Sequence, residues 1–439
     1  MLALQKYQNK RIAVYGMGIT GCSAAKELKK QKAKVFCWDD DKKTRSVLKK
    51  TGFILDKFWL KKNFVDIIVI SPGIDINKCK IKKYLKKNIN KIITDIDLFF
   101  EMNKNATIIS ITGTNGKSTT CKIIEKILRT ARFNVKTVGN IGKPVLSLNR
   151  KKNLIFILEV SSYQLQYSKL FRSKYAAILN ISVDHLERHR TIKNYIKVKS
   201  KIFFAQKNSD YSYINLSNKY SQDIKSILKK KKIKSKLIQV NKKNFSFLLK
   251  KINNNYFKSQ GNIENLAFAY KITKNLKIND STIIKAVNNF KGLAHRQETI
   301  MENNKLLCIN DSKATSFDAS LQSLLNYDDI YWIVGGLPKF NDDFNFRNIK
   351  KKIIKAYIIG KNTSFFEKKI KNDLSYKISE NIKNAINDIY NDLKHNKYKK
   401  KTILLSPAAA SFDQFNNFET RGLCFKKLIF KKFKDTKNV

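Results

Sequence analysis

Short apolar runs alternate with amphipathic stretches along the whole chain. Many of these runs end in Gly, Asp or Ser, and a segment with helical spacing of apolar residues then follows. A strand, a turn and a helix in this order are typical of parallel β-sheets whose strands are joined by crossover helices. The pattern therefore predicts an α/β protein.

The predicted strands fall into three series. The first series has strands at Arg11–Tyr15, Lys34–Trp38 and Val65–Ile70. The second series covers the segments Ala106–Thr120, Leu154–Ser162 and Tyr175–His185. The third series has strands near Leu306–Ile309, Ile330–Val334, Ala356–Ile359 and Thr402–Leu405, with a closing helix at Phe418–Phe433. Between about residues 220 and 260 the sequence is rich in Lys, Asn and Ser and predicts no definite element.

The length agrees with three domains, because 439 residues divide into roughly three units of about 150 residues. We expect a Rossmann-like domain at 1–95, a central P-loop mononucleotide-binding parallel sheet at 96–293 and a second Rossmann-like domain at 294–439. Hydrophobic residues make up 42% of the chain and only 4 residues are Pro, so most of it is expected to fold.

The chain is strongly basic, with 89 Lys and Arg against 34 Asp and Glu and a net charge of +55. One interpretation is a surface for a polyanion, as in a nucleic-acid-binding protein. The other is general lysine enrichment on solvated faces. Only eleven of the basic residues are Arg, and the Lys runs, such as Lys229–Lys232 and Lys399–Lys401, do not form one module with interleaved aromatics. We therefore expect no nucleic acid partner, although the charge suits anionic small substrates.

The six cysteines contain no CxxC pair, which disfavours a zinc ribbon or a disulfide framework and fits a reducing cytosol. The N-terminal segment lacks the apolar core of a signal peptide, and no apolar run approaches the ~18 residues of a membrane-spanning helix. We expect a cytoplasmic protein without membrane insertion.

A glycine-rich segment, Gly113-Thr114-Asn115-Gly116-Lys117-Ser118, lies between a predicted strand and a helical stretch. Glycines let backbone amides approach phosphate oxygens, and the N-terminus of the following helix favours anions. We expect Lys117 to reach the β and γ phosphates of ATP, and Ser118 or Thr119 to hold Mg²⁺. Ile111 stands where the full P-loop pattern begins with Gly, so the loop is a shortened relative of that pattern.

Two further segments of the central series carry metal-binding side chains. Glu159 follows a predicted strand at its carboxyl end, and Asp184-His185 is expected to end the next strand in the same way. Both ends can therefore converge on one phosphate-bound cation. The alternative for His185 is a buried structural histidine. A zinc site built from His185 and His189 lacks the Glu of the HExxH pattern and is disfavoured.

A second glycine loop, Gly16–Gly21, follows the first predicted strand and has the pattern GxGxxG. Asp39 lies about 20 residues further on, which completes a dinucleotide-binding fingerprint. By this pattern alone the protein would be an NAD-dependent enzyme. Hydride transfer, however, requires neither the second nucleotide loop nor the metal-binding side chains of the central series.

Five segments together resemble the Mur ligases. They are TGTNGKST at Thr112–Thr119, EVSSYQL at Glu159–Leu165, NISVDHLERH at Asn180–His189, NDSKAT at Asn310–Thr315 and LSPAAASFDQF at Leu405–Phe415. The resemblance extends from Gly16 to Gly422 and so covers all three predicted domains. It implies a UDP-sugar-binding domain at 1–95, an ATP-binding domain at 96–293 and an amino-acid-binding domain at 294–439.

The resemblance also implies an activity. It is the ATP-dependent ligation of D-glutamate to UDP-N-acetylmuramoyl-L-alanine through an acyl phosphate, in peptidoglycan precursor synthesis. The expected cofactors are ATP and Mg²⁺, with two metal ions, and the expected state is a monomer. Sibling ligases that add L-alanine, diaminopimelate, lysine or glutamate to other acceptors are the nearest alternatives.

Site residues carried over from the family fall into four groups. The ATP site would combine the phosphate loop with Asn262, Asn265, Arg296, Asp311 and Lys313. The UDP part of the acceptor would contact Gly18, Ile19, Thr20, Ser71, Pro72, Gly73 and Asn140. D-glutamate would be held by Thr315, Lys339, Ser411 and Phe418. The metal ions would be held by Ser118, Glu159, His185 and Lys199, of which the last three, with Lys117, form the catalytic set.

Lys199 illustrates how the resemblance changes an interpretation. It lies on a predicted helix, Tyr195–Ala205, and composition alone would make it one more surface lysine. Its spacing from Tyr195 matches the carbamylated lysine of the family, and carbamylation would make it an anionic metal ligand.

Two positions depart from the family pattern. Gly261 stands where a His usually precedes the Asn pair, and Asp39–Asp41 stand where the family offers Thr-Arg for the uracil.

Overall fold

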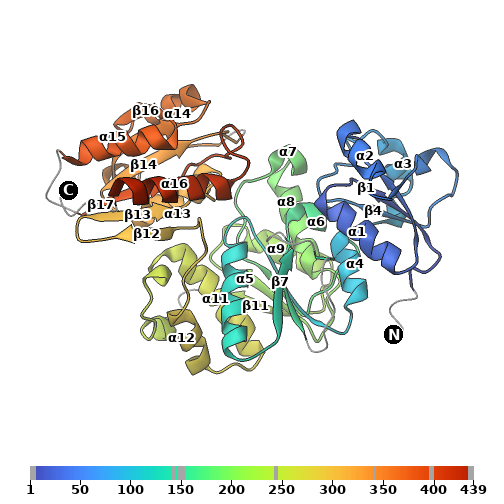
Figure 1. The fold of residues 1–439 in the computed structure, drawn as a ribbon. Helices are drawn as coiled ribbons and strands as arrows, with labels where there is room; N and C mark the ends of the chain where they lie inside the picture. Colours follow the sequence, from blue (N-terminus) through green and yellow to red (C-terminus); the bar gives the residue numbers. More distant parts are fainter. Residues whose placement is uncertain are drawn as a thin grey trace. The chain divides into compact units, whose positions relative to one another are not determined.

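The computed structural model describes residues 6–139, 145–146, 154–241, 246–339, 342–394 and 400–433. Within these ranges the chain forms three β-sheets whose strands alternate with helices (Figure 1). It divides into two compact units, residues 1–257 with 262–290 and residues 258–261 with 291–439. The first two sheets belong to the first unit and the third sheet to the second. The predicted α/β class is confirmed.

The first sheet has the strand order β3-β2-β1-β4-β5, and its pairs are parallel. The strands are β1 (Arg11–Tyr15), β2 (Lys34–Trp38), β3 (Ile54–Leu55), β4 (Ile67–Ile70) and β5 (Ile92–Ile93). The helices are α1 (Ile19–Lys30), α2 (Lys42–Lys49), α3 (Lys82–Lys87) and, after β5, α4 (Asp95–Met102). The strand order reverses between β1 and β4, and ligands of open parallel sheets bind at such a point, beyond the carboxyl ends of the strands.

The second sheet has the order β11-β10-β9-β6-β8-β7 and is parallel as well. Its strands are β6 (Thr107–Thr112), β7 (Val135–Gly139), β8 (Ile155–Glu159), β9 (Tyr175–Ile178), β10 (Tyr211–Asn215) and β11 (Lys236–Val240). Its helices are α5 (Lys117–Thr130), α6 (Ser162–Gln166), α7 (Leu186–His189), α8 (Ile192–Ser200), α9 (Ser221–Lys230), α10 (Ser246–Leu249), α11 (Gln260–Asn275) and α12 (Asp280–Asn288).

Both faces of the second sheet are buried. Along β8, Ile155 and Ile157 pack into one apolar cluster, while Phe156 and Leu158 pack into another on the opposite face. This alternation follows from the two-residue period of a strand. The cluster around Phe156 continues into the first sheet and its helices, and the ring of Phe99 on α4 meets that of Phe156 at 5.0 Å between centroids. A continuous core therefore joins the first two sheets into one unit.

The third sheet has the order β12-β13-β17-β14-β15-β16 and is parallel except for β12, which pairs with β13 in the antiparallel sense. Its strands are β12 (Glu298–Glu302), β13 (Leu306–Asn310), β14 (Ile330–Gly335), β15 (Ile353–Ile359), β16 (Tyr376–Glu380) and β17 (Lys401–Leu405). Its helices are α13 (Phe317–Asn326), α14 (Thr363–Ile370), α15 (Ile382–Lys394) and α16 (Phe418–Phe433).

Several predicted element boundaries were wrong. The strand expected to end at His185 stops at Ile178, so Asp184 and His185 lie on a loop. The helix expected at Tyr195–Ala205 begins at Ile192 and gives way to a 3₁₀ turn at Lys201. The edge strand β11 was missed because most of its residues are exposed or half-exposed and lysines surround it, as is common at sheet edges. The domain boundary near residue 95 stays a prediction.

Candidate active site

The phosphate loop joins β6 to α5 in the first unit. Gly116 has φ +82°, and a Cβ added there would lie 2.1 Å from Oδ1 of Asn265, so this position requires glycine. Helix α5 starts at the next residue, Lys117. The Lys117 ammonium donates to the backbone carbonyls of Gly113 and Thr114 at 2.8 and 2.7 Å. The loop thus places a cation and a helix N-terminus together, as an anion site requires.

Glu159 is the last residue of β8, beside the phosphate loop. Its side chain is buried, and its Oε2 accepts a hydrogen bond from the Ser118 hydroxyl at 2.5 Å. A carboxylate and a hydroxyl oxygen in contact are ligands that suit Mg²⁺. Among the residues described, no group of three or more His, Cys, Asp and Glu side chains could hold a metal ion, so a site here needs ligands of other types as well.

Lys199 is buried, with only 2% of its surface exposed, and the interpretation of it as a surface lysine is wrong. Its ammonium donates to the carbonyl of Gly113 at 2.9 Å and lies 4.7 Å from the centre of the Tyr195 ring. Burial lowers the pKa of this ammonium well below its usual value, and the positive charge of Lys117 lowers it further. A lysine with a lowered pKa carries a neutral, nucleophilic amine in a larger fraction of molecules.

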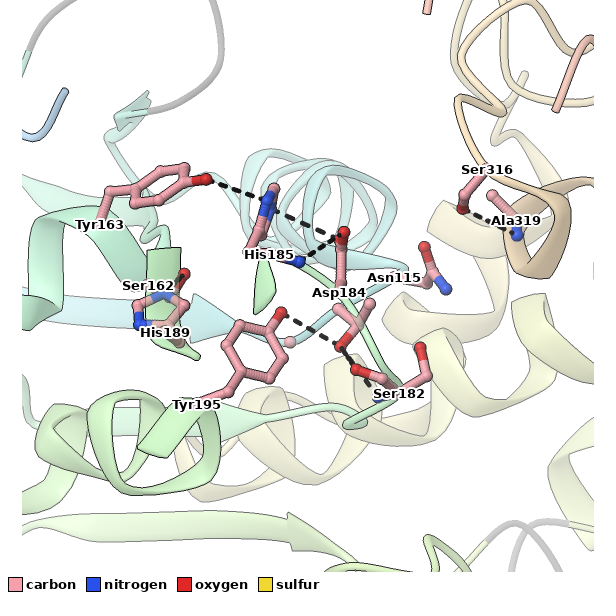
Figure 2. Close-up of polar contacts among 12 residues, drawn as sticks. Asn115, Ser162, Tyr163, Ser182, Asp184, His185, His189, Tyr195, Ser316 and Ala319 are labelled. Atoms are coloured by element: carbon pink, nitrogen blue, oxygen red, sulfur yellow. Dashed lines mark hydrogen bonds and ion pairs between the residues drawn. The ribbon is translucent and has the colours of Figure 1, made fainter. Parts of the chain in front are cut away.

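His185 precedes the short helix α7 and has a left-handed backbone, with φ +56°. Figure 2 shows the hydroxyl of Tyr163 directed toward the imidazole, with 3.1 Å between that oxygen and Nδ1. The Asp184 carboxylate lies 3.4 Å from Nε2. His189 is buried, its Nε2 contacts the Ser162 hydroxyl at 3.0 Å, and burial lowers its pKa to about 4. His189 is therefore a neutral structural residue.

The loop that carries His185 is tied to the phosphate loop. The hydroxyl of Thr114 accepts a hydrogen bond from the backbone N–H of Ser182 at 3.0 Å and lies 3.3 Å from the hydroxyl of Tyr195. The side-chain carbonyl of Asn180 accepts from the N–H of Asn115 at 2.8 Å. These contacts hold the two loops in one arrangement.

A cavity of about 490 Å³ opens beside these loops within the first unit. One side is formed by the first glycine loop and by the segment after β4, with Gly16, Gly18, Ile19, Thr20, Ser71, Pro72 and Gly73. The other side includes Lys117, His185, Tyr195 and Lys199. Both glycine loops therefore serve one cavity. Asn140 falls outside the described residues.

Asp39, the acidic residue of the dinucleotide pattern, is used by the protein itself. Its Oδ2 accepts a hydrogen bond from the N–H of Met17 at 2.6 Å, and its Oδ1 accepts from the N–H of Asp41 at 2.9 Å. In an NAD-binding fold this carboxylate would be presented to the ribose hydroxyls. Here the carboxylate is fixed by these two backbone N–H groups and also lines the cavity beside the first glycine loop.

Asn265 lies against the phosphate loop on α11, where its Oδ1 accepts a hydrogen bond from the Thr120 hydroxyl at 3.2 Å. Asn262, one turn earlier, donates to the carbonyl of Tyr256 at 2.9 Å. Both asparagines are nearly buried. The Asn pair is thus positioned from the same unit as the phosphate loop.

The remaining predicted site residues belong to the second unit, mainly on loops at the carboxyl ends of its strands. Asp311, Lys313 and Thr315 follow β13, Lys339 follows β14 and Ser411 follows β17. Phe418 begins α16, and the ammonium of Lys313 lies 3.7 Å from the centre of its ring. Arg296 lies before β12. Burial raises the pKa of the Asp311 carboxyl to about 6.

Arg421 is a buried residue of the second unit that the sequence patterns did not identify. It donates to the hydroxyl and the carbonyl of Ser312 at 3.0 and 2.7 Å, and to the carbonyl of Ala409 at 2.9 Å. It thereby joins the loop after β13 to the loop after β17. In the sequence, the one sign of its structural role was that arginine is rare in this lysine-rich chain.

We expect the Arg421→Met substitution to lower the stability of the second unit by about 3 kcal/mol, because it leaves two buried carbonyls without their donor. Thermal denaturation followed by circular dichroism measures this effect. Lys350→Ala is the control, because Lys350 forms an exposed ion pair with Asp373 in the same unit. An unchanged unfolding temperature in Arg421→Met would show that the arginine does not hold the two loops together.

The sequence matches two domains of a known protein family. Residues 10–93 match the Mur ligase MurD-like N-terminal domain, and residues 111–289 match the Mur ligase middle domain. A UDP-N-acetylmuramoylalanine–D-glutamate ligase of Rickettsia felis is 36% identical over 97% of this chain and 98% of its own length. One of a Wolbachia from Brugia malayi is 33% identical over 99% of each chain. The chain belongs to the UDP-N-acetylmuramoylalanine–D-glutamate ligases of the Mur ligase family.

Solved structures of other Mur ligases share the fold. The UDP-N-acetylmuramate-alanine ligase of Thermotoga maritima matches with a TM-score of 0.53 at 13% identity, over 98% of this chain and 100% of that one. A pseudomurein peptide ligase type C of Methanothermus fervidus matches with a TM-score of 0.53 at 16% identity, over 96% and 100%. None of the described helices of this Mur ligase is long and apolar enough to cross a membrane.

Proposed function

We propose that this Mur ligase joins D-glutamate to UDP-N-acetylmuramoyl-L-alanine in peptidoglycan precursor synthesis, with ATP converted to ADP and phosphate. The cavity of the first unit supports this function most directly. It is lined on one side by a glycine loop suited to a diphosphate and on the other by the lysine of an ATP-type phosphate loop. Such a cavity fits a nucleotide-linked acceptor whose far end must meet ATP.

The reaction requires activation of a carboxylate, because hydroxide is a poor leaving group at neutral pH. The carboxylate of the acceptor attacks the γ-phosphorus of ATP and gives an acyl phosphate, and the amine of D-glutamate then displaces phosphate. Lys117 and the N-terminus of α5 stabilise the charge on the transferring phosphoryl group. Positioning of both reactants supplies much of the remaining rate enhancement.

Divalent metal fits the side chains around the phosphate loop. Ser118 and Glu159 would hold one Mg²⁺, which neutralises charge on the phosphate oxygens, and His185 with a carbamylated Lys199 would hold a second. The buried position of Lys199 and its lowered pKa support this role, because only the neutral amine adds to carbon dioxide. Addition forms an N–C bond, releases one proton and leaves an anionic pair of oxygens.

Acceptor binding is assigned to the first sheet. Helix α1 begins at Ile19, directly after Gly18, so the N–H groups of Ile19 and Thr20 are available to a diphosphate. Ser71, Pro72 and Gly73 lie after β4 on the same cavity wall. We assign domain 1–95 to the UDP sugar on this basis.

The second unit is assigned to the amino acid and to part of ATP. Thr315, Lys339, Ser411 and Phe418 would hold D-glutamate, and Arg296, Asp311 and Lys313 would complete the ATP site with Asn262 and Asn265. ATP would then contact both domains, 96–293 and 294–439, and D-glutamate only the second of them. Reaction would require the domains to close on both substrates. A cytoplasmic monomer remains our expectation.

Phosphate release tests the proposal. The protein is incubated with ATP, Mg²⁺ and UDP-N-acetylmuramoyl-L-alanine, and D-glutamate, L-glutamate, L-lysine or diaminopimelate is added in separate reactions. Of the four amino acids, we expect only D-glutamate to cause the release of phosphate. Release with another amino acid would contradict the proposed specificity for D-glutamate. A change in NADH fluorescence on addition of the protein would favour the dinucleotide enzyme.

Ser411→Ala and Lys339→Ala are each expected to raise the KM for D-glutamate much more than the KM for ATP. Each side chain is assigned to a carboxylate of the amino acid, and a hydrogen bond to an ionised group contributes about 1.5–3 kcal/mol. Steady-state kinetics with each substrate varied in turn measures the split, with Lys350→Ala as the matched surface control. Equal increases for both substrates would point to domain closure or folding instead.

A further inference from the structure

Asp95 is a buried carboxylate on the wall of the cavity that no assigned role uses. It is the first residue of α4, only 3% of its surface is exposed, and it lines the cavity together with Ser161, Ser162, Tyr163 and Gln164. Its Oδ2 accepts a hydrogen bond from the side-chain amide of Gln164 at 3.1 Å. Its Oδ1 is buried and has no hydrogen-bond partner within the described ranges.

Asp97, on the same helix, is a structural carboxylate whose two oxygens are both hydrogen-bonded within the protein. Asp97 is fully buried, and its Oδ1 accepts hydrogen bonds from the Ser168 hydroxyl at 2.7 Å and from the N–H groups of Leu170 and Phe171 at 2.8 and 2.9 Å. Its Oδ2 accepts from the N–H of Thr94 at 2.9 Å. The fold satisfies both oxygens of Asp97.

Oδ1 of Asp95 therefore differs from both oxygens of Asp97, because it has no hydrogen-bond partner among the described residues. An unsatisfied buried acceptor destabilises the folded state, and such groups are rare in native proteins. Burial also raises the pKa of the Asp95 carboxyl to about 6, although the Gln164 amide and the backbone N–H of Ile96 favour the ionised form. A ligand that brought a hydrogen-bond donor to Oδ1 would remove this cost of burial.

The position of Asp95 limits the chemistry of that donor. The cavity is lined by the glycine loop at Gly18–Thr20, which we assign to a diphosphate, and by Lys117. The acceptor of the proposed function is anionic at its diphosphate and at its terminal carboxylate, whereas the sugar and the amide between them are uncharged. A carboxylate repels the two anionic ends and accepts from the hydroxyl and amide N–H groups of the middle.

We propose that Asp95 binds the uncharged sugar-peptide middle of the acceptor, with Oδ1 accepting a hydrogen bond from a hydroxyl or amide N–H group of the substrate. This inference rests on the proposed function. Gln164 holds the carboxylate from the other side through Oδ2. Because α4 packs into the apolar core that joins the two sheets of the first unit, a contact at Asp95 fixes how far along the cavity the substrate extends. It thereby sets the position of the reacting carboxylate near Lys117.

The test compares two probes by isothermal titration calorimetry on the full chain, without ATP. They are UDP-N-acetylmuramoyl-L-alanine and UDP, and the variant is Asp95→Asn. The Asn side chain gives its one oxygen to Gln164 and turns an N–H₂ group toward the cavity, so the donor of the substrate meets another donor. We expect affinity for the full acceptor to fall roughly tenfold or more and affinity for UDP to stay unchanged.

Asp97→Asn is the matched control, because it changes a buried carboxylate of the same helix that does not line the cavity. We expect it to lower the unfolding temperature and to leave the ratio of the two affinities unchanged. Asp95→Ala, which removes both oxygens, is the second variant and should show the same selective loss. An equal loss for UDP and for the full acceptor, or no loss for either, would overturn the role of Asp95. Failure of the wild-type protein to bind the full acceptor would overturn the proposed function itself.

Discussion

Lys117→Ala is expected to reduce ATP-dependent phosphate release roughly a thousandfold at saturating ATP. Lys117 is the lysine of the phosphate loop, and its ammonium donates to the carbonyls of Gly113 and Thr114. This places the ammonium within the loop, where it can bind phosphate oxygens. The substitution removes that charge from the transition state and leaves the packing of α5 unchanged. Turnover measured in a coupled phosphate assay gives the size of the effect.

Lys126→Ala is the control for that experiment. Lys126 lies on the same helix, two and a half turns further on, and is not part of the loop. We expect it to keep wild-type turnover and stability. If Lys117→Ala retained more than about a tenth of wild-type turnover, a barrier change below about 1.4 kcal/mol, the assignment of this loop to ATP would be wrong.

Lys199→Ala is expected to lose on the order of a hundredfold in activity, because an anionic metal ligand is replaced by a methyl group. The alanine leaves room where the carbamate lay, so short carboxylates such as acetate should restore part of the activity. Acetate should not restore Lys117→Ala, which lacks a cation rather than an anion. Lys199→Arg should remain inactive, since a guanidinium stays cationic and does not form the carbamate. Activities with and without acetate measure these effects.

Lys197→Ala is the matched control for Lys199. Lys197 lies two residues earlier on α8 and is exposed. It should retain full activity and show no response to acetate. Full activity of Lys199→Ala would mean that the buried lysine contributes only packing and the hydrogen bond to the Gly113 carbonyl.

Local sequence patterns predicted the parts of the site that depend on strand ends. The strand before Gly113 is rich in Ile, and the strand that ends at Glu159 begins with four apolar residues. Residues that follow such strands lie at one edge of a parallel sheet. The glycines of the phosphate loop could be recognised in the sequence as well. Gly116 has a backbone conformation and a close neighbour that exclude a side chain, so the loop requires glycine there.

The loops were less predictable, because their conformation depends on contacts between distant segments. His185 was expected at a strand end, but the chain leaves β9 after Ile178 and reaches His185 through a loop anchored on the Thr114 hydroxyl. Composition pointed to a surface position for Lys199, since the chain is rich in lysine. Its burial results from the packing of α8 against the phosphate loop, which helical spacing alone does not reveal.

Buried polar residues outside the motifs were the hardest to predict. Asp95 and Asp97 are two acidic residues at the start of one helix, which by sequence is a favourable arrangement at a helix N-terminus and nothing more. Only the three-dimensional contacts distinguish them, because Asp97 is fully hydrogen-bonded and Asp95 retains one buried oxygen without a partner. Arg421 likewise joins two loops that are far apart in sequence.

In the proposed mechanism the protein activates the acceptor carboxylate with ATP and transfers it to D-glutamate. The most direct measurement uses UDP-N-acetylmuramoyl-L-alanine labelled with oxygen-18 in its free carboxylate, with mass spectrometry of both products. We expect an acceptor extended by one D-glutamate and one labelled oxygen in each phosphate released, because that oxygen passes to phosphorus in the acyl phosphate. Unlabelled phosphate, or an equal yield of product with L-glutamate, would contradict it.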